Sequence, residues 1–214
     1  MSVVNSALKK FHEDEYTPQT LPMSENVTRY WDRYWGRCAI KLKPGEFSVS
    51  AAEEVLVTVV GTSSAVCFRD TSTSMAGMVH FMLPIAGLSY LDRSTQFLAE
   101  EYGYFAMTRL LNSMEDHGAD LDCIEASIVG GARLWRPSAA CAEATVRFIR
   151  QYLAKQKIPI TVEFTGPRKP KKIYFTHSHR TPDVRVLEEY TSTIRKREQK
   201  YLNCVRADWM LPTR

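Results

Sequence analysis

The sequence has few cysteines, no long apolar run and little excess of charge of either sign. Its five cysteines are far apart along the chain, and none forms a C-x-x-C pair. That number and spacing argue against both a disulfide framework and a zinc ribbon. A transmembrane helix needs about 18 or more consecutive apolar residues, and no such run is present. We therefore expect no metal site and no direct insertion into a membrane.

The charge balance excludes another class of function. The 28 basic residues outnumber the 24 acidic ones by only four, which is too little for the electrostatic footprint of a nucleic-acid-binding protein. We expect the local basic run RKPKK, at residues 168–172, to be a solvated loop. The N-terminal residues lack the apolar segment and the cleavage site of a signal peptide, so we expect a cytoplasmic protein.

What the sequence does contain is ample material for a folded core, with 44% hydrophobic and 11% aromatic residues. Apolar and β-branched runs predict strands on either side of the Pro44-Gly45 turn and at residues 55–60, 65–68, 78–83, 124–129, 160–164 and 173–176. Apolar residues at helical spacing predict helices along residues 104–114, 146–153 and 187–201. Strands interleaved with helices in this way predict one mixed α/β domain.

The N-terminal segment differs from the rest of the chain. Residues 1–25 are polar and show no apolar period. We expect them to form a flexible N-terminal extension, with the folded domain at residues 26–214.

A turn rich in small hydroxylated residues, GTSSAVC at residues 61–67, follows the apolar run 55–60. A nucleophile in a glycine-containing turn after a strand has backbone N–H donors beside it. His80 lies in the next apolar run, and a strand-turn-strand return can bring it to Ser63 as a general base. The residues alone leave a second interpretation open, in which Ser63 is a turn residue and His80 a hydrogen-bonded core histidine.

Other candidates have simpler structural interpretations. His177 and His179 have the spacing of two ligands on one strand, but no third ligand is near in sequence, which favours a loop. Gly130-Gly131 follows a predicted strand and favours a sharp turn or close packing over an anion site. Cys67 is typical of a buried strand residue.

Several segments together resemble one known family. They are VTVVGTSSAVCFRD (57–70), AGMVHFMLP (76–84), RYWDRYWGRCAIKLKPGEFSV (29–49), EASIVGGARLW (125–135), KKIYF (171–175) and TIRKREQKYL (193–202). They are similar to the pattern of CheD, the chemoreceptor glutamine deamidase family of bacterial chemotaxis. The resemblance covers about residues 29–205, nearly the whole chain. It implies a single CheD-like α/β domain with packed β-sheets flanked by helices.

The resemblance also implies roles for individual residues. His80 matches the family's catalytic histidine, and Thr58 matches a threonine that supports the site. Ser63 stands at the nucleophile position, which is a cysteine in the family. A serine hydroxyl is a far weaker acid than a thiol, so we expect amide hydrolysis to fall by several orders of magnitude. We do not expect Cys67 to substitute, because it matches a separate, non-catalytic cysteine of the pattern.

The expected chemistry is hydrolysis of glutamine side-chain amides on the cytoplasmic domains of chemoreceptors, without a metal or an organic cofactor. Backbone N–H groups of the turn would stabilise the oxyanion, and the turn residues involved are Gly61, Thr62 and Ser64. We expect other chemotaxis signalling proteins as further partners.

Three interpretations of the chain's function stay open, given a serine at position 63. The chain is a deamidase with an impaired site, a non-catalytic CheD-like binding module, or an unrelated serine hydrolase, which would need an acidic residue beside His80. An engineered substitution and natural divergence would both leave serine at this position. Ala76 and Ser127, which stand where the family has glycine and lysine, favour divergence.

Overall fold

The computed structural model describes residues 27–50, 54–85, 93–134, 136–166, 168–189 and 191–209. The expected extension at residues 1–25 lies outside these ranges. The strands are β1 (Thr28–Asp32), β2 (Arg37–Lys41), β3 (Glu46–Ser50), β4 (Val55–Val60), β5 (Ser64–Asp70), β6 (Ala76–Phe81), β7 (Ile124–Gly130), β8 (Ile160–Thr165), β9 (Lys171–Phe175) and β10 (Asp183–Val186). The helices are α1 (Arg93–Asp116), α2 (Arg136–Gln156), α3 (Thr191–Trp209) and a short 3-10 turn, η2 (Leu121–Cys123).

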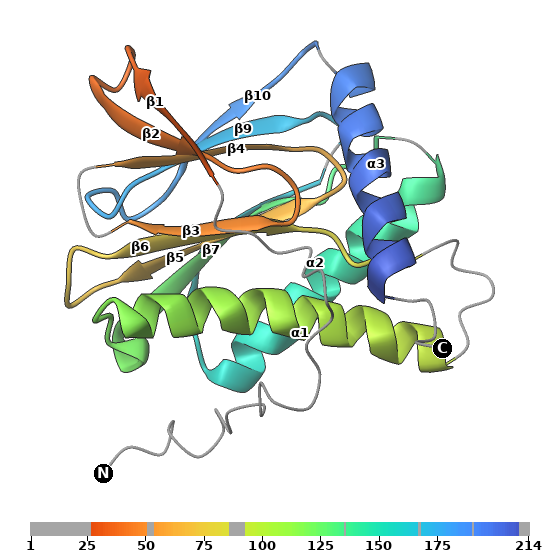
Figure 1. The fold of residues 1–214 in the computed structure, drawn as a ribbon, viewed down its shortest axis with the longest axis horizontal. Helices are drawn as coiled ribbons and strands as arrows, with labels where there is room; N and C mark the ends of the chain where they lie inside the picture. The colour runs from red at the N-terminus through yellow and green to blue at the C-terminus, as the bar shows by residue number, and fades with distance from the viewer. Residues whose placement is uncertain are drawn as a thin grey trace.

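Two five-stranded sheets lie one above the other (Figure 1). One has the strand order β1-β2-β4-β9-β10 and the other β3-β6-β5-β7-β8. Most neighbouring strands are antiparallel, and the pairs β2–β4 and β7–β8 are parallel. Helices α1 and α2 cover the outer face of the second sheet, whereas α3 crosses one end of both sheets. The prediction of an α/β domain with packed sheets flanked by helices is confirmed.

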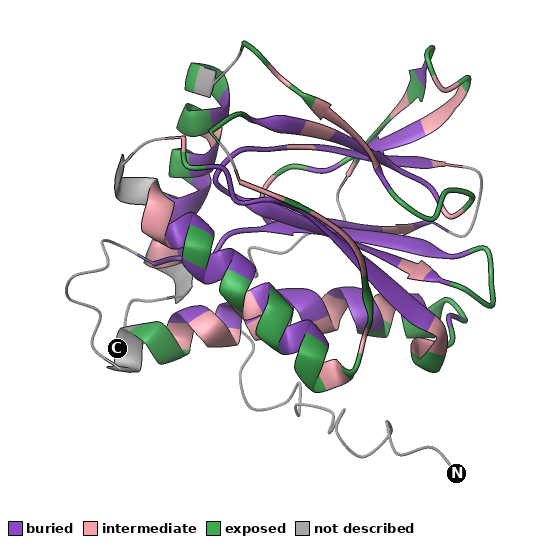
Figure 2. Ribbon diagram, turned by 180° about the vertical axis from the view of Figure 1, so that it is seen from behind, coloured by how far each residue is buried: buried purple, intermediate pink, exposed green. Residues whose placement is uncertain are grey.

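The central strands of the second sheet, β6, β5 and β7, are buried on both faces, as their purple colour in Figure 2 shows, whereas the edge strand β8 is partly exposed. Side chains alternate between the faces of a strand, so β5 sends Val66 and Phe68 toward the helices. It sends Ala65 and Cys67 toward the first sheet. This double burial explains why the central strands are continuous apolar runs in the sequence.

The predicted strands and helices are observed, with three corrections. The sequence patterns did not predict β1 and β10, which are the edge strands of the first sheet. The run at 168–172 is only partly a solvated loop, because β9 begins at Lys171, and this lysine is buried with its ammonium donating to the carbonyl of Gly166. Leu187 precedes α3 instead of lying on it, since its N–H donates to the carbonyl of Pro170 beside β9.

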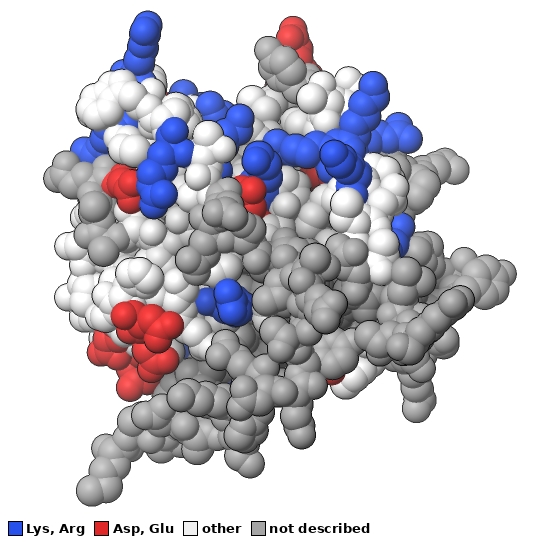
Figure 3. All heavy atoms as spheres, in the orientation of Figure 1, with Lys and Arg blue, Asp and Glu red and all other residues white. Residues whose placement is uncertain are grey.

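Charged side chains are unevenly distributed on the surface. Figure 3 shows lysine and arginine gathered over the upper part of one face. Acidic side chains gather at the lower left, near the C-terminal end of α1, where the exposed residues include Glu115, Asp116, Asp120 and Asp122. Among the described residues, no helix combines the length and the apolar character needed to cross a membrane.

The Gly130-Gly131 pair is used for close packing, as the sequence suggested. Gly130 has a φ of +135°, and a Cβ atom there would lie 2.3 Å from the carbonyl oxygen of Ser63. The N–H of Gly131 donates to this same carbonyl at 3.0 Å. The end of β7 therefore packs closely against the turn between β4 and β5 and donates a hydrogen bond to it.

Replacing Gly130 by alanine should destabilise the fold more than replacing Gly118. Gly118 also has a positive φ, but a Cβ there meets nothing within 4 Å. Its replacement should cost about 1–2 kcal/mol of backbone strain. At Gly130 the clash with the turn should add about 1–3 kcal/mol. Urea titration measures both costs, and equal midpoints for the two variants would contradict the close packing.

Candidate active site

Ser63 and His80 are brought together by the pairing of β5 with β6. Ser63 ends the turn between β4 and β5, and Ala65, two residues later, lies opposite His80 in the antiparallel pair. The Ser63 Oγ atom is 2.7 Å from the Nε2 atom of His80. Both side chains are fully buried. The hydroxyl and the imidazole are therefore in direct hydrogen-bonding contact.

Thr58, on β4, fixes which nitrogen of His80 carries the proton. The Thr58 hydroxyl donates to the carbonyl of Leu42 at 2.9 Å, which uses its only proton. Its oxygen lies 2.7 Å from the Nδ1 atom of His80 and so accepts a hydrogen bond from that nitrogen. We assign the Nδ1–H tautomer from this network. The lone pair of Nε2 then faces Ser63, which is the orientation of a general base.

The imidazole of His80 is held in its neutral form. Burial lowers its pKa well below the ordinary value of 6.5, and the positive charge of Arg197 on α3 lowers the pKa further. A neutral imidazole can accept a proton from a nucleophile. The tautomer and the protonation state of His80 thus agree with one another.

A buried carboxylate, Glu198 on α3, occupies the backbone donors of the turn. Its Oε1 atom accepts from the N–H of Gly61 at 2.8 Å and from that of Ser63 at 3.1 Å. Its Oε2 atom accepts from the N–H of Thr62 at 2.9 Å. The Ser63 hydroxyl also contacts Oε1. Three converging N–H groups form an anion-binding concavity, and here the anion comes from the protein itself.

Helix α3 is fixed over this end of the sheets by further contacts. Arg197 donates to the carbonyl of Val59, at the end of β4. The hydroxyl of Tyr201 contacts that of Tyr102 on α1. Arg206 donates to the carbonyl of Ile85 at 2.7 Å. Contacts along three turns of α3 thus hold Glu198 over the site.

Gly61 allows α3 to approach the turn this closely. A Cβ atom at Gly61 would lie 3.0 Å from Oε2 of Glu198 and 3.0 Å from a methyl group of Ile194, both on α3. It would lie only 2.5 Å from a methyl carbon of Leu134. The glycine of the turn is therefore required by packing as well as by hydrogen bonding.

The structure brings Ser63, His80 and Thr58 together as the sequence suggested, and it turns the N–H groups of Gly61 and Thr62 toward one point. Ser64 was expected to belong to the same turn. It instead begins β5, where it pairs with Phe81 and Gly130. Its buried hydroxyl has no hydrogen-bond partner among the described residues.

Sequence reasoning missed Glu198 altogether. The segment TIRKREQK reads as a charged, solvated helix face, and its glutamate is 135 residues from Ser63. One signal was present, because Glu198 lies four residues after Ile194 and three before Tyr201, on the apolar stripe of the helix. A charged residue on that stripe is an exception that calls for a buried partner.

The remaining candidates do not enter the site. Cys67 is buried toward the first sheet, and burial strongly raises the pKa of its thiol. This environment is that of an inert core cysteine.

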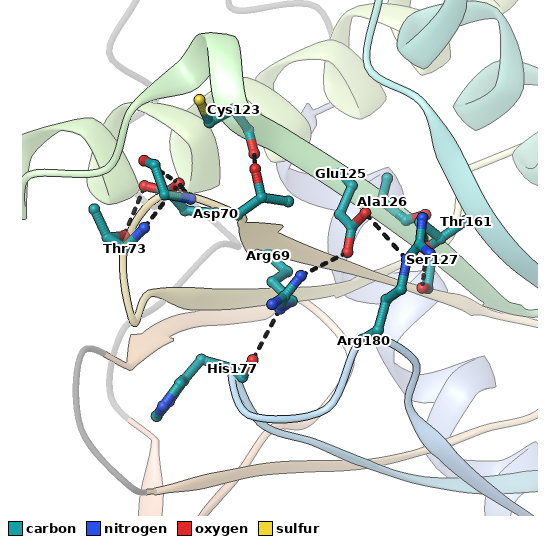
Figure 4. A network of polar contacts seen from close by, with 12 residues as sticks. Arg69, Asp70, Thr73, Cys123, Glu125, Ala126, Ser127, Thr161, His177 and Arg180 are labelled. Carbon is teal, nitrogen blue, oxygen red and sulfur yellow. Dashed lines mark hydrogen bonds and ion pairs between the residues drawn. The ribbon is translucent and has the colours of Figure 1, made fainter.

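His177 and His179 lie in the loop after β9, and this loop has a structural role (Figure 4). Arg69 on β5 donates to the carbonyl of His177 at 2.9 Å and to Glu125 on β7 at 2.9 Å. Arg180 lies 3.5 Å from the same carboxylate. These contacts tie the two sheets together. The residues that the structure describes contain no group of three histidine, cysteine or acidic side chains able to hold a metal ion.

Comparison with known proteins assigns the family. A family model described as CheD chemotactic sensory transduction matches residues 82–186, beginning just after His80. The chain is 31% identical over 202 residues to a probable chemoreceptor glutamine deamidase CheD of Hahella chejuensis, covering 94% of this chain and 93% of the relative. It is 35% identical over 188 residues to the protein of the same name from Laribacter hongkongensis, with coverages of 86% and 90%. The chain therefore belongs to the CheD family.

Replacing His80 by glutamine should flatten the pH dependence of stability between about pH 6.5 and pH 5. Below the ordinary pKa of 6.5 the unfolded chain binds a proton at His80, whereas the folded chain does not. The free energy of unfolding should therefore fall as the pH falls, by at most about 1.4 kcal/mol per pH unit, and this contribution should be complete above pH 6.5.

Urea unfolding of the wild-type protein and of H80Q at matched pH values measures this slope. The difference between the two proteins removes the contribution of the other titrating groups. The same slope in both proteins would contradict a neutral buried imidazole.

Proposed function

We propose that this chain is a cytoplasmic protein that acts on glutamine side chains in the cytoplasmic domains of chemoreceptors. We further propose that Ser63 holds the position of the family's nucleophilic cysteine and leaves the site strongly impaired. The observation that carries this proposal is the buried hydrogen-bonded series Ser63–His80–Thr58 beside three converging N–H groups. The names of the relatives, probable chemoreceptor glutamine deamidases, support the substrate class.

The proposed chemistry requires a nucleophile at position 63. A thiol there would pass its proton to Nε2 of His80 and attack the amide carbon of a glutamine side chain. N–H groups of the turn would bind the resulting oxyanion. The C–N bond would then break as His80 returns the proton to the leaving ammonia. One water molecule would hydrolyse the thioester, leaving glutamate and the free thiol.

Ser63 is poorly suited to this reaction for two reasons. A hydroxyl is a much weaker acid than a thiol, so attack must be concerted with proton removal by a well-aligned base. In addition, the single proton of Ser63 faces two acceptors, the Nε2 atom of His80 and the Oε1 atom of Glu198. A proton donated to the carboxylate is not available to the imidazole. Both effects oppose transfer of the proton from Ser63 to His80.

A non-catalytic binding module is the second candidate function. Glu198 favours it, because this carboxylate already fills the three N–H groups that an oxyanion would use. Such a module would dock on receptors or other chemotaxis signalling proteins without hydrolysing an amide.

A serine hydrolase of the Ser-His-acid type fits the contacts less well. In that arrangement the carboxylate accepts from the Nδ1–H of the histidine. Here Thr58 occupies that side of His80, and the carboxylate of Glu198 lies on the serine.

Replacing Ser63 by cysteine should restore deamidation of a cognate receptor cytoplasmic fragment. Ammonia release and the mass shift of glutamine peptides measure the reaction. S63C should be active, the wild-type protein should be far slower, and S63C/H80A should lose about 10²–10⁴-fold relative to S63C because the general base is gone. If S63C hydrolyses no amide of the fragment while retaining its fold, the binding module becomes the better account.

In the S63C background, replacing Thr58 by valine should lower kcat and leave KM nearly unchanged. Valine has the shape of threonine but cannot accept the Nδ1–H bond, so the tautomer of His80 is no longer fixed. A loss of kcat of about tenfold or more is expected, with recovery in T58S, which retains the hydroxyl. A change confined to KM, or no recovery in T58S, would contradict the positioning role of Thr58.

A further inference from the structure

We propose that α3 is a built-in mimic of the reaction product, and that Glu198 occupies the place of a substrate side chain whose amide has been hydrolysed. Helix α3 must then leave before a receptor helix can enter. The identity of the outside helix rests on the proposed function, whereas the closure of the site by α3 does not. The two parts can therefore be tested separately.

The chemistry of Glu198 matches the product. Hydrolysis of a glutamine side chain yields a glutamate side chain of the same length. The carboxylate of Glu198 contacts the oxygen of Ser63, which stands at the nucleophile position, and accepts from the N–H groups of Gly61, Thr62 and Ser63. An acyl oxygen of a bound substrate would use these same donors.

The way in which Glu198 is presented also matters, because it lies on a helix. The apolar residues of α3 that pack inward beside it are fully or nearly fully buried and lie at positions −4, +3, +4 and +7 relative to Glu198: Ile194, Tyr201, Leu202 and Val205. The outer face carries exposed basic residues, among them Arg195, Lys196 and Lys200. The site is thus shaped for a glutamine on a helix with apolar side chains at these spacings.

Access to the site depends on α3. Ser63, His80 and Glu198 all have 0% exposed surface. A receptor glutamine cannot reach the hydroxyl while α3 is in place. Departure of α3 would free the three N–H groups and would leave the proton of Ser63 to a single acceptor, His80. Opening and activation would then be one event.

The first experiment tests whether the protein hydrolyses an amide placed at position 198 of its own chain. In the variant S63C/E198Q, the amide introduced at position 198 should lie where the substrate amide lies. The thiol should attack it and release one ammonia, and water should hydrolyse the thioester to glutamate. Mass spectrometry of the α3 peptide should show conversion at position 198, or the thioester cross-link that precedes it. Gln199 is the matched control, because it is adjacent and exposed and should keep its amide.

Two further controls define this reaction. Neither E198Q with Ser63 retained nor S63C/H80A/E198Q should convert within the same time. If S63C hydrolyses a receptor fragment but S63C/E198Q leaves position 198 as an amide, the product-mimic proposal is overturned and the proposed function stands. Conversion at position 198 without hydrolysis of the receptor fragment would support the mimic and overturn the receptor assignment.

The second experiment measures closure without any amide chemistry. The thiol of S63C is labelled with a neutral maleimide in a C204S background, and Cys67 serves as an internal monitor of global unfolding. Adding Y201F removes one anchor of α3 and leaves the buried hydroxyl of Tyr102 without that contact. Labelling at position 63 should rise about tenfold, while labelling at Cys67 stays unchanged. Replacing the exposed Gln199 by alanine should change neither rate.

The labelling result decides the closure by itself. An unchanged rate at position 63 in Y201F would overturn closure by α3. An equal rise at Cys67 would also overturn it, because the anchor would then support the whole fold. If neither the amide at position 198 nor that of the receptor fragment is hydrolysed, the proposed deamidase chemistry is wrong. The labelling experiment alone then supports or overturns closure of the site by α3.

Discussion

The hydrogen bonds between the carboxylate of Glu198 and the turn at residues 61–63 are the constraint on which the site depends. A buried carboxylate is strongly unfavourable without donors, and buried N–H groups are unfavourable without acceptors. Each group satisfies the other here, so the turn is held in one conformation and α3 is held over it. Ser63 is fully buried beneath this contact, and His80, which contacts Ser63, is fully buried beside it.

The same contact explains how an enzyme-like arrangement can exist in a resting state. Thr58 fixes the tautomer of His80, and burial keeps the imidazole neutral. The Nε2 atom of His80 can therefore accept a proton. The oxygen of Ser63 has one proton and two acceptors, and the three N–H groups that we propose would bind an oxyanion already donate to Glu198. Membership of the CheD family gives the arrangement its proposed chemistry, and α3 gives it a proposed control. A substrate helix must replace the contacts of α3, which makes opening depend on recognition.

Much of this structure could be predicted from the sequence, and the failures have physical causes. Doubly buried strands such as β4 are continuous apolar runs, so they were recognised. The approach of Ser63 to His80 was predicted from a strand-turn-strand return, and the family resemblance supplied their expected roles. The edge strands β1 and β10 are partly exposed and lack such runs. Lys171 is buried because a carbonyl accepts from its ammonium, which no local pattern shows. Glu198 was missed because its role depends on a contact across 135 residues.

Hydrogen exchange of α3 and of the 61–63 turn, with and without a receptor cytoplasmic fragment, tests the central claim most directly. In the free protein both segments should exchange slowly, because the three turn amides are buried and bonded to Glu198. Binding of the fragment should speed exchange along α3 while the turn stays protected by the side chain that replaces Glu198. If the fragment binds and α3 keeps its full protection, the receptor helix does not take the place of α3, and the account is wrong.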